Sequence, residues 1–355
     1  MRLLFLLLVV QTVWAQHEPA SKKGVAFNTS YKASWPERFE ALKPFWHYSW
    51  NWEYSSSYPE GVQFVPMVWG KSNATQDRIS YLNNLAADEK ISHVLTFNEP
   101  DLEGQANLTV DEAISYWSLF ETLHVSISSP ATSAPLNAWM LEFMEKATAQ
   151  GLRIDFIPIH IYHKNTAQKF LDLVAEVYQR FQKPIWITEF ALKDPMATVN
   201  QPNRYSEQEA LDFMKAVLEG LEALPYVHRY AWFDPNASHP NYPKVAVSDL
   251  ITETNQLTSL GAFYAAHSPS NDLAASQLKE MQQVFLYPNP CVSYVHVELA
   301  DPSEFNIVNL LGDTIKKGYL HEGKNTIDVS SLPKGMYFLQ LFSSNGSHHK
   351  QLFIH

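Results

Sequence analysis

The sequence has one cysteine among its 355 residues, no sustained run of basic residues, and no long apolar run beyond its N-terminus. A lone Cys291 excludes an intrachain disulfide. Without histidine-rich surroundings, it is typical of a small semi-buried residue rather than a catalytic thiol. The formal net charge is −11, and nucleic-acid binding needs a concentrated Lys/Arg surface, so that class of partner is disfavoured. No later segment is long enough to cross a membrane.

The N-terminal stretch MRLLFLLLVVQTVWAQ has one basic residue, an apolar run over Leu3–Val10, and Val13 and Ala15 before Gln16. This pattern predicts a secretory signal peptide over residues 1–15, which is cleaved after Ala15 and is too short to span a membrane. We therefore expect the mature protein to be an exported, soluble monomer.

Eight short apolar segments alternate with helical patterns over residues 16–267, which we assign to one domain. Most of these segments are apolar on both faces, as expected of parallel strands that are covered by helices. The predicted strands are Lys23–Asn28, Phe45–Trp52, Val62–Gly70, His93–Pro100, His124–Thr132, Asp155–His163, Pro184–Leu192 and Val227–Pro235.

Two of the helical segments open with capping boxes, Thr109 with Glu112 and Ser206 with Glu209. The connection Glu53–Gly61 is too short and too rich in serine to form a helix. Eight βα units in a chain of this length predict an α/β fold, the (β/α)8 TIM barrel. A doubly wound sheet is the alternative, but no G-x-G-x-x-G sequence follows the first strand.

The pattern changes after Ser268. Residues 268–283 form a polar linker, and residues 284–355 contain short alternating strands separated by turn residues. This spacing predicts a small C-terminal all-β sandwich.

Two carboxylates stand at strand ends, Glu99 on the fourth strand and Glu189 on the seventh. In a barrel of this kind the active site lies at the C-terminal ends of the strands. Glycoside hydrolysis needs one carboxylic acid to protonate the leaving oxygen and one carboxylate to attack or to activate water. Pro100 is expected to keep Glu99 out of the helical region and to make the chain leave the strand in an extended direction.

A series of short motifs makes the prediction specific. The chain carries, in this order, WHYSW, VPMVWG, LTFNEPD, GQANLTVDEA, SSPAT, IHIYH, KPIWITEFA, RYAWF and LTSLGAFY. Over residues 22–267 it therefore resembles glycoside hydrolase family 128. The resemblance implies a retaining enzyme that cleaves β-1,3-glucan of the laminarin or curdlan type by double displacement, with endo action.

The resemblance also implies roles for individual residues. Glu99 corresponds to the acid/base and Glu189 to the nucleophile, with carboxyl groups roughly 5 Å apart. Their proximity and partial burial are expected to leave Glu99 protonated and Glu189 ionised. Asn98 is expected to bind the 2-hydroxyl of the sugar being cleaved, and Tyr162 to orient Glu189. The further substrate-binding candidates are Tyr48, Trp50, Trp69, His160 and Trp232, with Trp232 as the floor of the same subsite.

Two residues depart from the family pattern: Ser49 replaces an asparagine, and Ile161 replaces a tryptophan. Both leave the shape of the subsites open. His160 and His163 raise the alternative of a zinc hydrolase, but such barrels have an H-x-H at the end of the first strand, and GVAFN offers none. We therefore predict no metal and no cofactor.

The C-terminal module resembles the sorting domain of bacterial type IX secretion substrates, through LYPNP, FNIVNLLGDTI, LPKGMYFLQL and the ending HHKQLFIH. This implies a bacterial protein that interacts with the type IX machinery and is secreted or displayed at the outer-membrane surface. A carbohydrate-binding sandwich is the alternative that composition alone permits.

The predicted partner is thus a β-glucan polysaccharide. Two alternatives remain within enzymes, an exo-acting glycosidase or a β-1,4-specific one of the same clan. A third, from another class, is a glucan-binding protein without activity, which would be free to lose either glutamate.

Overall fold

The computed structural model describes residues 21–27, 35–162, 166–233, 243–252, 254–267, 285–287, 289, 291–299, 301–309, 313–343 and 346–354. The chain divides into two compact units, Met1–Ser268 and Pro269–His355, which are treated separately below. The predicted signal peptide, the predicted linker and His163 lie outside the described residues.

Each of the eight predicted strand segments contains a strand, shorter than predicted. The strands are β1 (Lys23–Ala26), β2 (Trp46–Tyr48), β3 (Gln63–Phe64), β4 (His93–Val94), β5 (Ser126–Ile127), β6 (Ile157–Ile161), β7 (Ile185–Phe190) and β8 (Val227–Trp232).

Six of these strands form one sheet in the order β3-β2-β1-β8-β7-β6, and all of its pairs are parallel. β4 and β5 form a separate parallel pair. Single parallel bridges connect this pair to the sheet on both sides, from Met67 to Leu95 and from Ser128 to Phe156. Beyond β3, the N–H groups of Val65 and Met67 still donate toward the β2 side, to the carbonyls of His47 and Asn51, both at 2.9 Å.

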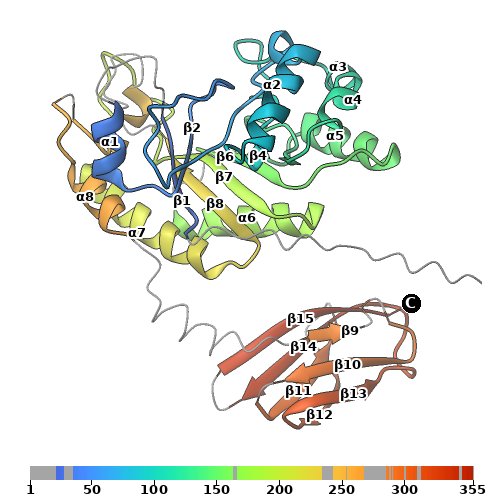
Figure 1. The fold of residues 1–355 in the computed structure, drawn as a ribbon. Helices are drawn as coiled ribbons and strands as arrows, with labels where there is room; N and C mark the ends of the chain where they lie inside the picture. The colour runs from blue at the N-terminus through green and yellow to red at the C-terminus, as the bar shows by residue number, and fades with distance from the viewer. Residues whose placement is uncertain are drawn as a thin grey trace, which may run out of the picture. The chain divides into compact units, whose positions relative to one another are not determined.

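Helices follow most strands (Figure 1): α1 (Trp35–Leu42), α2 (Gln76–Ala87), α3 (Val110–Ser115), α4 (Trp117–Phe120), α5 (Ala138–Ala149), α6 (Ala167–Phe181), α7 (Glu207–Ala223) and α8 (Ser259–Ala266). Lys71–Asn73 and Pro243–Ser248 form 3₁₀ turns. Both predicted capping boxes are present, at Thr109 and Ser206, and Glu53–Gly61 contains no helix. Among the described residues, no helix is long and apolar enough to cross a membrane.

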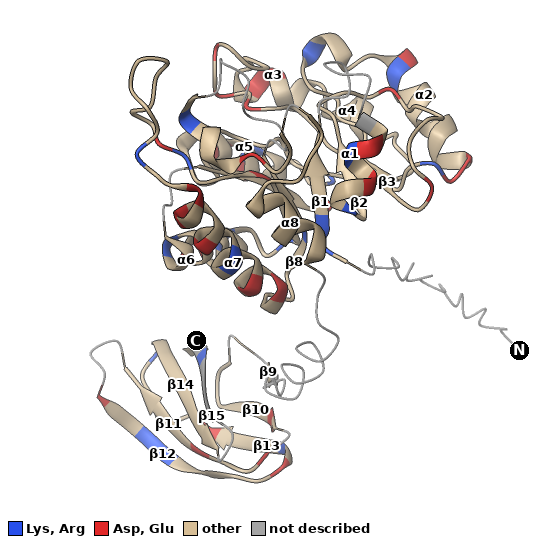
Figure 2. Cartoon of the chain, turned by 90° about the vertical axis from the view of Figure 1, so that its left-hand side faces the viewer, with Lys and Arg blue, Asp and Glu red and all other residues tan. Residues whose placement is uncertain are grey.

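The sheet has an apolar cluster on each face. Helix-facing residues such as Tyr230 and Trp232 pack with the helices, whereas Ala231 joins an enclosed cluster with Trp46 and Trp186. This alternation follows from the two-residue period of a strand. The helices bury their apolar stripes, and Figure 2 marks Asp and Glu positions in red along α6 and α7.

Two consecutive lysines at the start of β1 cap the ends of the last two helices. The ammonium groups of Lys22 and Lys23 each donate to three carbonyl groups. Lys22 binds those of Leu221, Glu222 and Leu224 at the end of α7, and Lys23 binds those of Tyr264, Ala265 and His267 at the end of α8. A cation at a helix C-terminus satisfies orphan carbonyls and opposes the negative end of the helix dipole.

The second unit is an all-β module with two antiparallel sheets, as predicted. One sheet has the order β13-β10-β9 and the other β12-β11-β14-β15. The strands are β9 (Phe285–Tyr287), β10 (Tyr294–Leu299), β11 (Ser303–Val308), β12 (Thr314–Leu320), β13 (Gly323–Asp328), β14 (Gly335–Ser343) and β15 (Gly346–Ile354). Cys291 belongs to its apolar core.

His47 is a buried histidine in the first unit, with its ring against Phe39, Tyr58 and Phe64. It has no exposed surface, and among the described residues neither ring nitrogen has a hydrogen-bond partner. Burial lowers the pKa of His47 to about 3. Because the unfolded chain binds a proton near pH 6.5 and the folded chain does not, stability falls as the pH drops from 6.5 toward 3.

We therefore expect His47→Phe to reduce the loss of stability between pH 7 and pH 4 by about 2–3 kcal/mol. Urea unfolding at the two pH values measures this difference. His124, which is exposed, supplies the control His124→Phe, because its ring is in water in the folded and the unfolded chain. An unchanged loss of stability in the His47 variant would contradict the assignment.

Candidate active site

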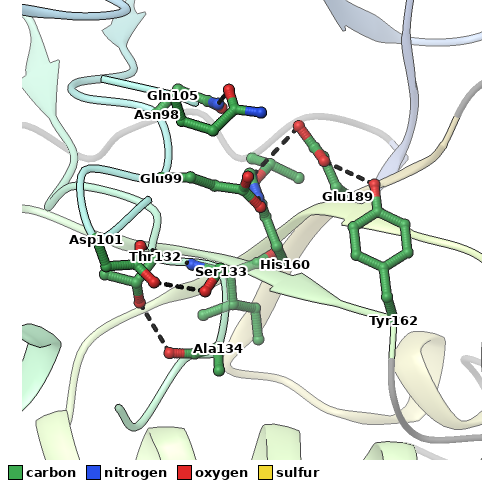
Figure 3. Close-up of polar contacts among 12 residues, drawn as sticks. Asn98, Glu99, Asp101, Gln105, Thr132, Ser133, Ala134, His160, Tyr162 and Glu189 are labelled. Atoms are coloured by element: carbon green, nitrogen blue, oxygen red, sulfur yellow. Dashed lines mark hydrogen bonds and ion pairs between the residues drawn. The ribbon is translucent and has the colours of Figure 1, made fainter. Parts of the chain in front are cut away.

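The two strand-end glutamates lie side by side. Glu189 belongs to β7 and is 5% exposed. The closest ligating oxygens of Glu99 and Glu189 lie within 4.8 Å of each other, and Figure 3 shows the two side chains pointing toward one another. The structure thus brings together two carboxylates that are ninety residues apart in the sequence.

The backbone of Glu99 is in the left-handed region, with φ of 41°. Glu99 thus avoids the right-handed helical region, but the next residues form turns, so the prediction that the chain leaves in an extended direction is wrong. The N–H of Glu99 donates to the carbonyl of Ala131 at 2.7 Å, and its carbonyl accepts from the N–H of Leu102 at 3.1 Å. These bonds on both sides fix the turn in spite of the preference of a residue that precedes proline.

Three side chains donate hydrogen bonds to the carboxylate of Glu189. The indole Nε1 of Trp50 lies 2.7 Å from Oε1, the hydroxyl of Tyr48 lies 3.3 Å from Oε1, and the hydroxyl of Tyr162 lies 2.6 Å from Oε2. Burial and the charge of Glu189 raise the pKa of Tyr162 well above its usual value, so the phenol stays protonated as a donor. The predicted contact between Tyr162 and Glu189 is present.

Tyr48 was predicted to contact substrate, but it has no exposed surface. The single hydroxyl hydrogen of Tyr48 is shared between the carbonyl of Thr188 at 3.0 Å and Oε1 of Glu189 at 3.3 Å, so Tyr48 contacts the carboxylate from within the core. Trp50 is only partly buried, and its ring meets that of Tyr48 edge to face. Trp50 therefore combines a hydrogen bond to Glu189 with a ring that is still open to a ligand.

His160, on β6, lies between the two carboxylates. Its Nδ1 is 3.0 Å from Oε1 of Glu99, and its Nε2 is 3.5 Å from Oε1 of Glu189. Burial lowers the pKa of His160, but the charge of Glu189 and the hydrogen bond and charge of Glu99 outweigh it, so the pKa is raised. Because His160 is fully buried, the prediction that it contacts the substrate is wrong; it contacts both glutamates instead.

The ligating atoms of Glu99, His160 and Glu189 all lie within 4.8 Å of one another, a spacing that permits a metal ion. The two ring nitrogens of His160 face different carboxylates, however, and an ion between them would use only one nitrogen. The 3.0 Å contact with Glu99 is an ordinary hydrogen-bond length. The arrangement therefore suits proton sharing, and the absence of a metal stays a prediction.

Asn98 is 3% exposed, and its amide nitrogen donates to Oε1 of Gln105 at 3.1 Å. Among the described residues, its amide oxygen has no partner. Gln105 was not predicted, because a residue in the loop after the strand carries no pattern that marks it. Trp69 is partly buried, and its backbone carbonyl accepts the N–H of Asn98 at 2.9 Å, so it adjoins the site; its contact with substrate stays a prediction.

Trp232 does not form the floor of the site. Its ring has no exposed surface, packs against Phe190 and Phe213, and donates to the carbonyl of Ser248 at 2.8 Å. A ring buried against the helices presents no face to a sugar, so the prediction for Trp232 is wrong.

The next residue, Phe233, is the aromatic that reaches the site. Its ring lies 5.7 Å from that of Trp50 and 5.4 Å from that of Tyr162, edge to face in both cases. Phe233 thus packs against two of the three donors to Glu189. Ala231 faces the enclosed cluster, and side chains two residues apart on a strand share a face. This alternation was the signal in the sequence that could have identified Phe233.

The two departures from the family pattern lie in different surroundings. Ile161 is buried in the helix-facing core cluster, away from the carboxylates. Ser49 is 6% exposed and precedes Trp50, so only Ser49 adjoins a residue that binds Glu189.

Comparison with protein families gives two matches. The glycosyl hydrolase catalytic core matches residues 24–264, and the secretion system C-terminal sorting domain matches residues 285–355. No curated protein sequence matches the chain.

Several solved structures are similar. A GH128 subgroup I endo-β-1,3-glucanase from Amycolatopsis mediterranei, in complex with laminaripentaose, shares 30% identity at a TM-score of 0.60, covering 70% of this chain and 100% of its own. A subgroup II endo-β-1,3-glucanase from Sorangium cellulosum shares 27% identity at 0.56, covering 69% and 98%. A subgroup III curdlan-specific exo-β-1,3-glucanase from Blastomyces gilchristii, in complex with glucose, shares 25% identity at 0.54, covering 70% and 100%.

Proposed function

The chain belongs to glycoside hydrolase family 128 and ends in a secretion system sorting domain, and we propose that it is a secreted retaining endo-β-1,3-glucanase. The observation that carries the proposal is the spacing of Glu99 and Glu189, whose closest oxygens lie within 4.8 Å. Retaining glycosidases have carboxyl groups about 5–5.5 Å apart, whereas inverting enzymes need about 6.5–9.5 Å to admit a water molecule.

In the first step, an oxygen of Glu189 forms a bond to the anomeric carbon while the glycosidic C–O bond breaks. Glu99 gives its proton to the departing oxygen. In the second step, Glu99 takes a proton from water, the water oxygen bonds to the anomeric carbon, and the Glu189 carboxylate is released. The configuration at the anomeric carbon is inverted twice and is therefore retained.

The surrounding residues prepare Glu189 for attack. Trp50, Tyr48 and Tyr162 donate to its two oxygens, and such donors bind a negative acceptor more strongly than a neutral one. We propose that Trp50, Trp69 and Phe233 contact the sugar rings, because each is only partly buried. We retain Asn98 as the residue that binds the 2-hydroxyl, since its amide oxygen is not used by any described residue.

The finer architecture is part of the proposal. Parallel bridges on both sides of the β4–β5 pair support closure of the eight strands into a (β/α)8 barrel. We assign residues 16–267 to the catalytic domain, 268–283 to a linker and 284–355 to the type IX sorting domain. Export would follow cleavage of the signal peptide after Ala15. The mature protein would then be released or held on the bacterial surface.

Incubation with laminarin, curdlan, cellulose and xylan tests the function. We expect release of oligosaccharides from the first two, with β-anomers appearing first in the proton NMR spectrum. A rapid fall in viscosity with mixed oligosaccharides indicates endo action, whereas a single short product indicates exo action. Initial α-anomers would exclude the retaining mechanism, and cleavage of xylan alone would exclude the substrate class.

Tyr162→Phe tests the support of Glu189. Hydrogen bonds to charged groups contribute about 1.5–3 kcal/mol, so we expect kcat on laminarin to fall about 10- to 100-fold. KM should change little, because the hydroxyl contacts the carboxylate rather than the sugar. Tyr178→Phe, whose ring stacks on Tyr226, is the matched control. A rise in KM with unchanged kcat would mean that Tyr162 contacts substrate instead.

A further inference from the structure

The loop that carries Glu99 is held in an unfavourable conformation. A residue other than glycine in the left-handed region typically costs about 1–3 kcal/mol and persists only when its surroundings impose it. Glu99 has φ of 41°. Its N–H bond to Ala131 connects the loop after β4 to the loop after β5. The other backbone bonds of this loop, such as those from Leu102 to Glu99 and from Leu108 to Pro100, join the loop to itself. Further contacts with the loop after β5 must therefore come from side chains.

Asp101 supplies these contacts. Its carboxylate accepts the N–H of Ser133 at 3.0 Å, the Ser133 hydroxyl, and the Nδ2 of Asn137 at 2.9 Å. Asn137 also caps α5, where its Oδ1 accepts the N–H of Met140 at 2.9 Å. The carboxylate thereby ties the turn that contains Glu99 to the start of a regular helix, as Figure 3 shows in part.

We propose that Asp101 is a positioning residue that holds the acid/base Glu99 against the glycosidic oxygen. The inference rests on the proposed function of Glu99. Asp101 donates no proton and touches no sugar in this account. It acts by preventing the strained turn from relaxing and withdrawing the carboxyl group of Glu99 from the site.

Asp101 also acts on the site through its charge. The charge of Asp101 contributes to the raised pKa of His160, after burial and the two glutamates. Two variants separate position from charge. Asp101→Asn removes the charge and sets an amide NH₂ against at least one N–H donor, whichever way the amide is turned. Ser133→Ala keeps the charge and removes only one donor.

The test compares two substrates that differ in their need for an acid. Laminarin has a sugar as its leaving group and needs a proton from Glu99. A 2,4-dinitrophenyl β-laminaribioside has a leaving group that departs unprotonated. We expect Asp101→Asn to lower kcat/KM on laminarin about 10- to 100-fold, because small misplacements of a reacting group have effects of this size. On the dinitrophenyl substrate we expect a loss of less than about 3-fold, and Ser133→Ala should show the same pattern more weakly.

Asp155→Asn is the matched control, since Asp155 also accepts a backbone N–H, from Ile127 at 2.8 Å, but at the start of β5. It should affect both substrates equally or not at all. Equal losses on both substrates in Asp101→Asn and Ser133→Ala would overturn positioning of the acid, as would full activity on laminarin. If a thermal unfolding experiment shows that Asp101→Asn is not folded, the comparison of the two substrates with Ser133→Ala decides whether Asp101 positions the acid. Failure of the wild type on both substrates would overturn the proposed function itself.

Discussion

Glu189→Gln is expected to abolish cleavage of laminarin, with kcat falling by at least about 10⁴-fold, the scale seen when a covalent nucleophile is removed. The amide cannot form the glycosyl-enzyme bond, so double displacement stops at its first step. Binding should survive, because the amide has the size and shape of the carboxylate and keeps one oxygen, which can still accept the hydrogen bond of Tyr162. Reducing-sugar release measures the loss, and calorimetry with laminarihexaose measures the retained affinity.

A matched control for Glu189→Gln is Glu222→Gln. Glu222 is a half-buried carboxylate at the end of α7 that accepts a hydrogen bond from Tyr230 at 2.6 Å. We expect this variant to keep activity within a few-fold of the wild type, since it lies on the helix side of the sheet. Comparable turnover by Glu189→Gln and the wild type would exclude the nucleophile assignment.

Glu99→Ala is expected to reduce kcat on laminarin by about 10²- to 10⁴-fold, the usual contribution of general acid–base catalysis. The variant should still form the glycosyl-enzyme from a dinitrophenyl glycoside, because that leaving group needs no proton. The second step then lacks its base, so the intermediate should accumulate and appear as a burst of dinitrophenol followed by slow turnover. Stopped-flow absorbance and intact-protein mass spectrometry detect the two signatures.

Added azide distinguishes this account from a general loss of structure. A small anionic nucleophile fits the space left by the side chain and needs no base, so it should restore turnover and yield a β-glycosyl azide. An α-glycosyl azide would instead place the acid/base role on Glu189. No burst with the dinitrophenyl substrate would mean that Glu99 is needed before the first bond breaks for a reason other than protonation.

Much of the fold was predictable because its signals are local. Apolar runs located all eight strands, and the side chains of Thr109 and Ser206 located two helix starts. These patterns involve residues within one or two turns of each other. The same information placed Glu99 and Glu189 at strand ends, where their meeting follows from the parallel arrangement alone.

The face of the sheet to which each side chain points was less predictable. The register of β7 shifts between Ile187 and Phe190, and that of β6 shifts between Ile159 and His160. Ile185 and Ile187 face the helices, so strict alternation would turn Glu189 away from the site. A one-residue irregularity in the strand shifts the alternation by one and turns Glu189 toward the site. The position of such an irregularity depends on the neighbouring strands rather than on the local sequence.

The aromatic residues show the same limit. Composition and position singled out Trp232 as a sugar platform, yet it packs against the helices and Phe233 meets Trp50. Hydrophobicity does not distinguish the two faces of a strand when both are apolar. Likewise, nothing local predicts the left-handed φ of Glu99, because bonds from a different loop impose it.

Lys22 and Lys23 determine when this domain can finish folding. Their hydrogen bonds join residues separated by 199 to 244 positions along the chain. β1 can pair with β2 early, but the two ammonium groups gain all of their acceptors only after residue 267 has been synthesised. Contacts of such long range close large loops and form late. The carbonyl groups at the ends of α7 and α8 thus remain without these lysine donors until the two ends of the unit have come together.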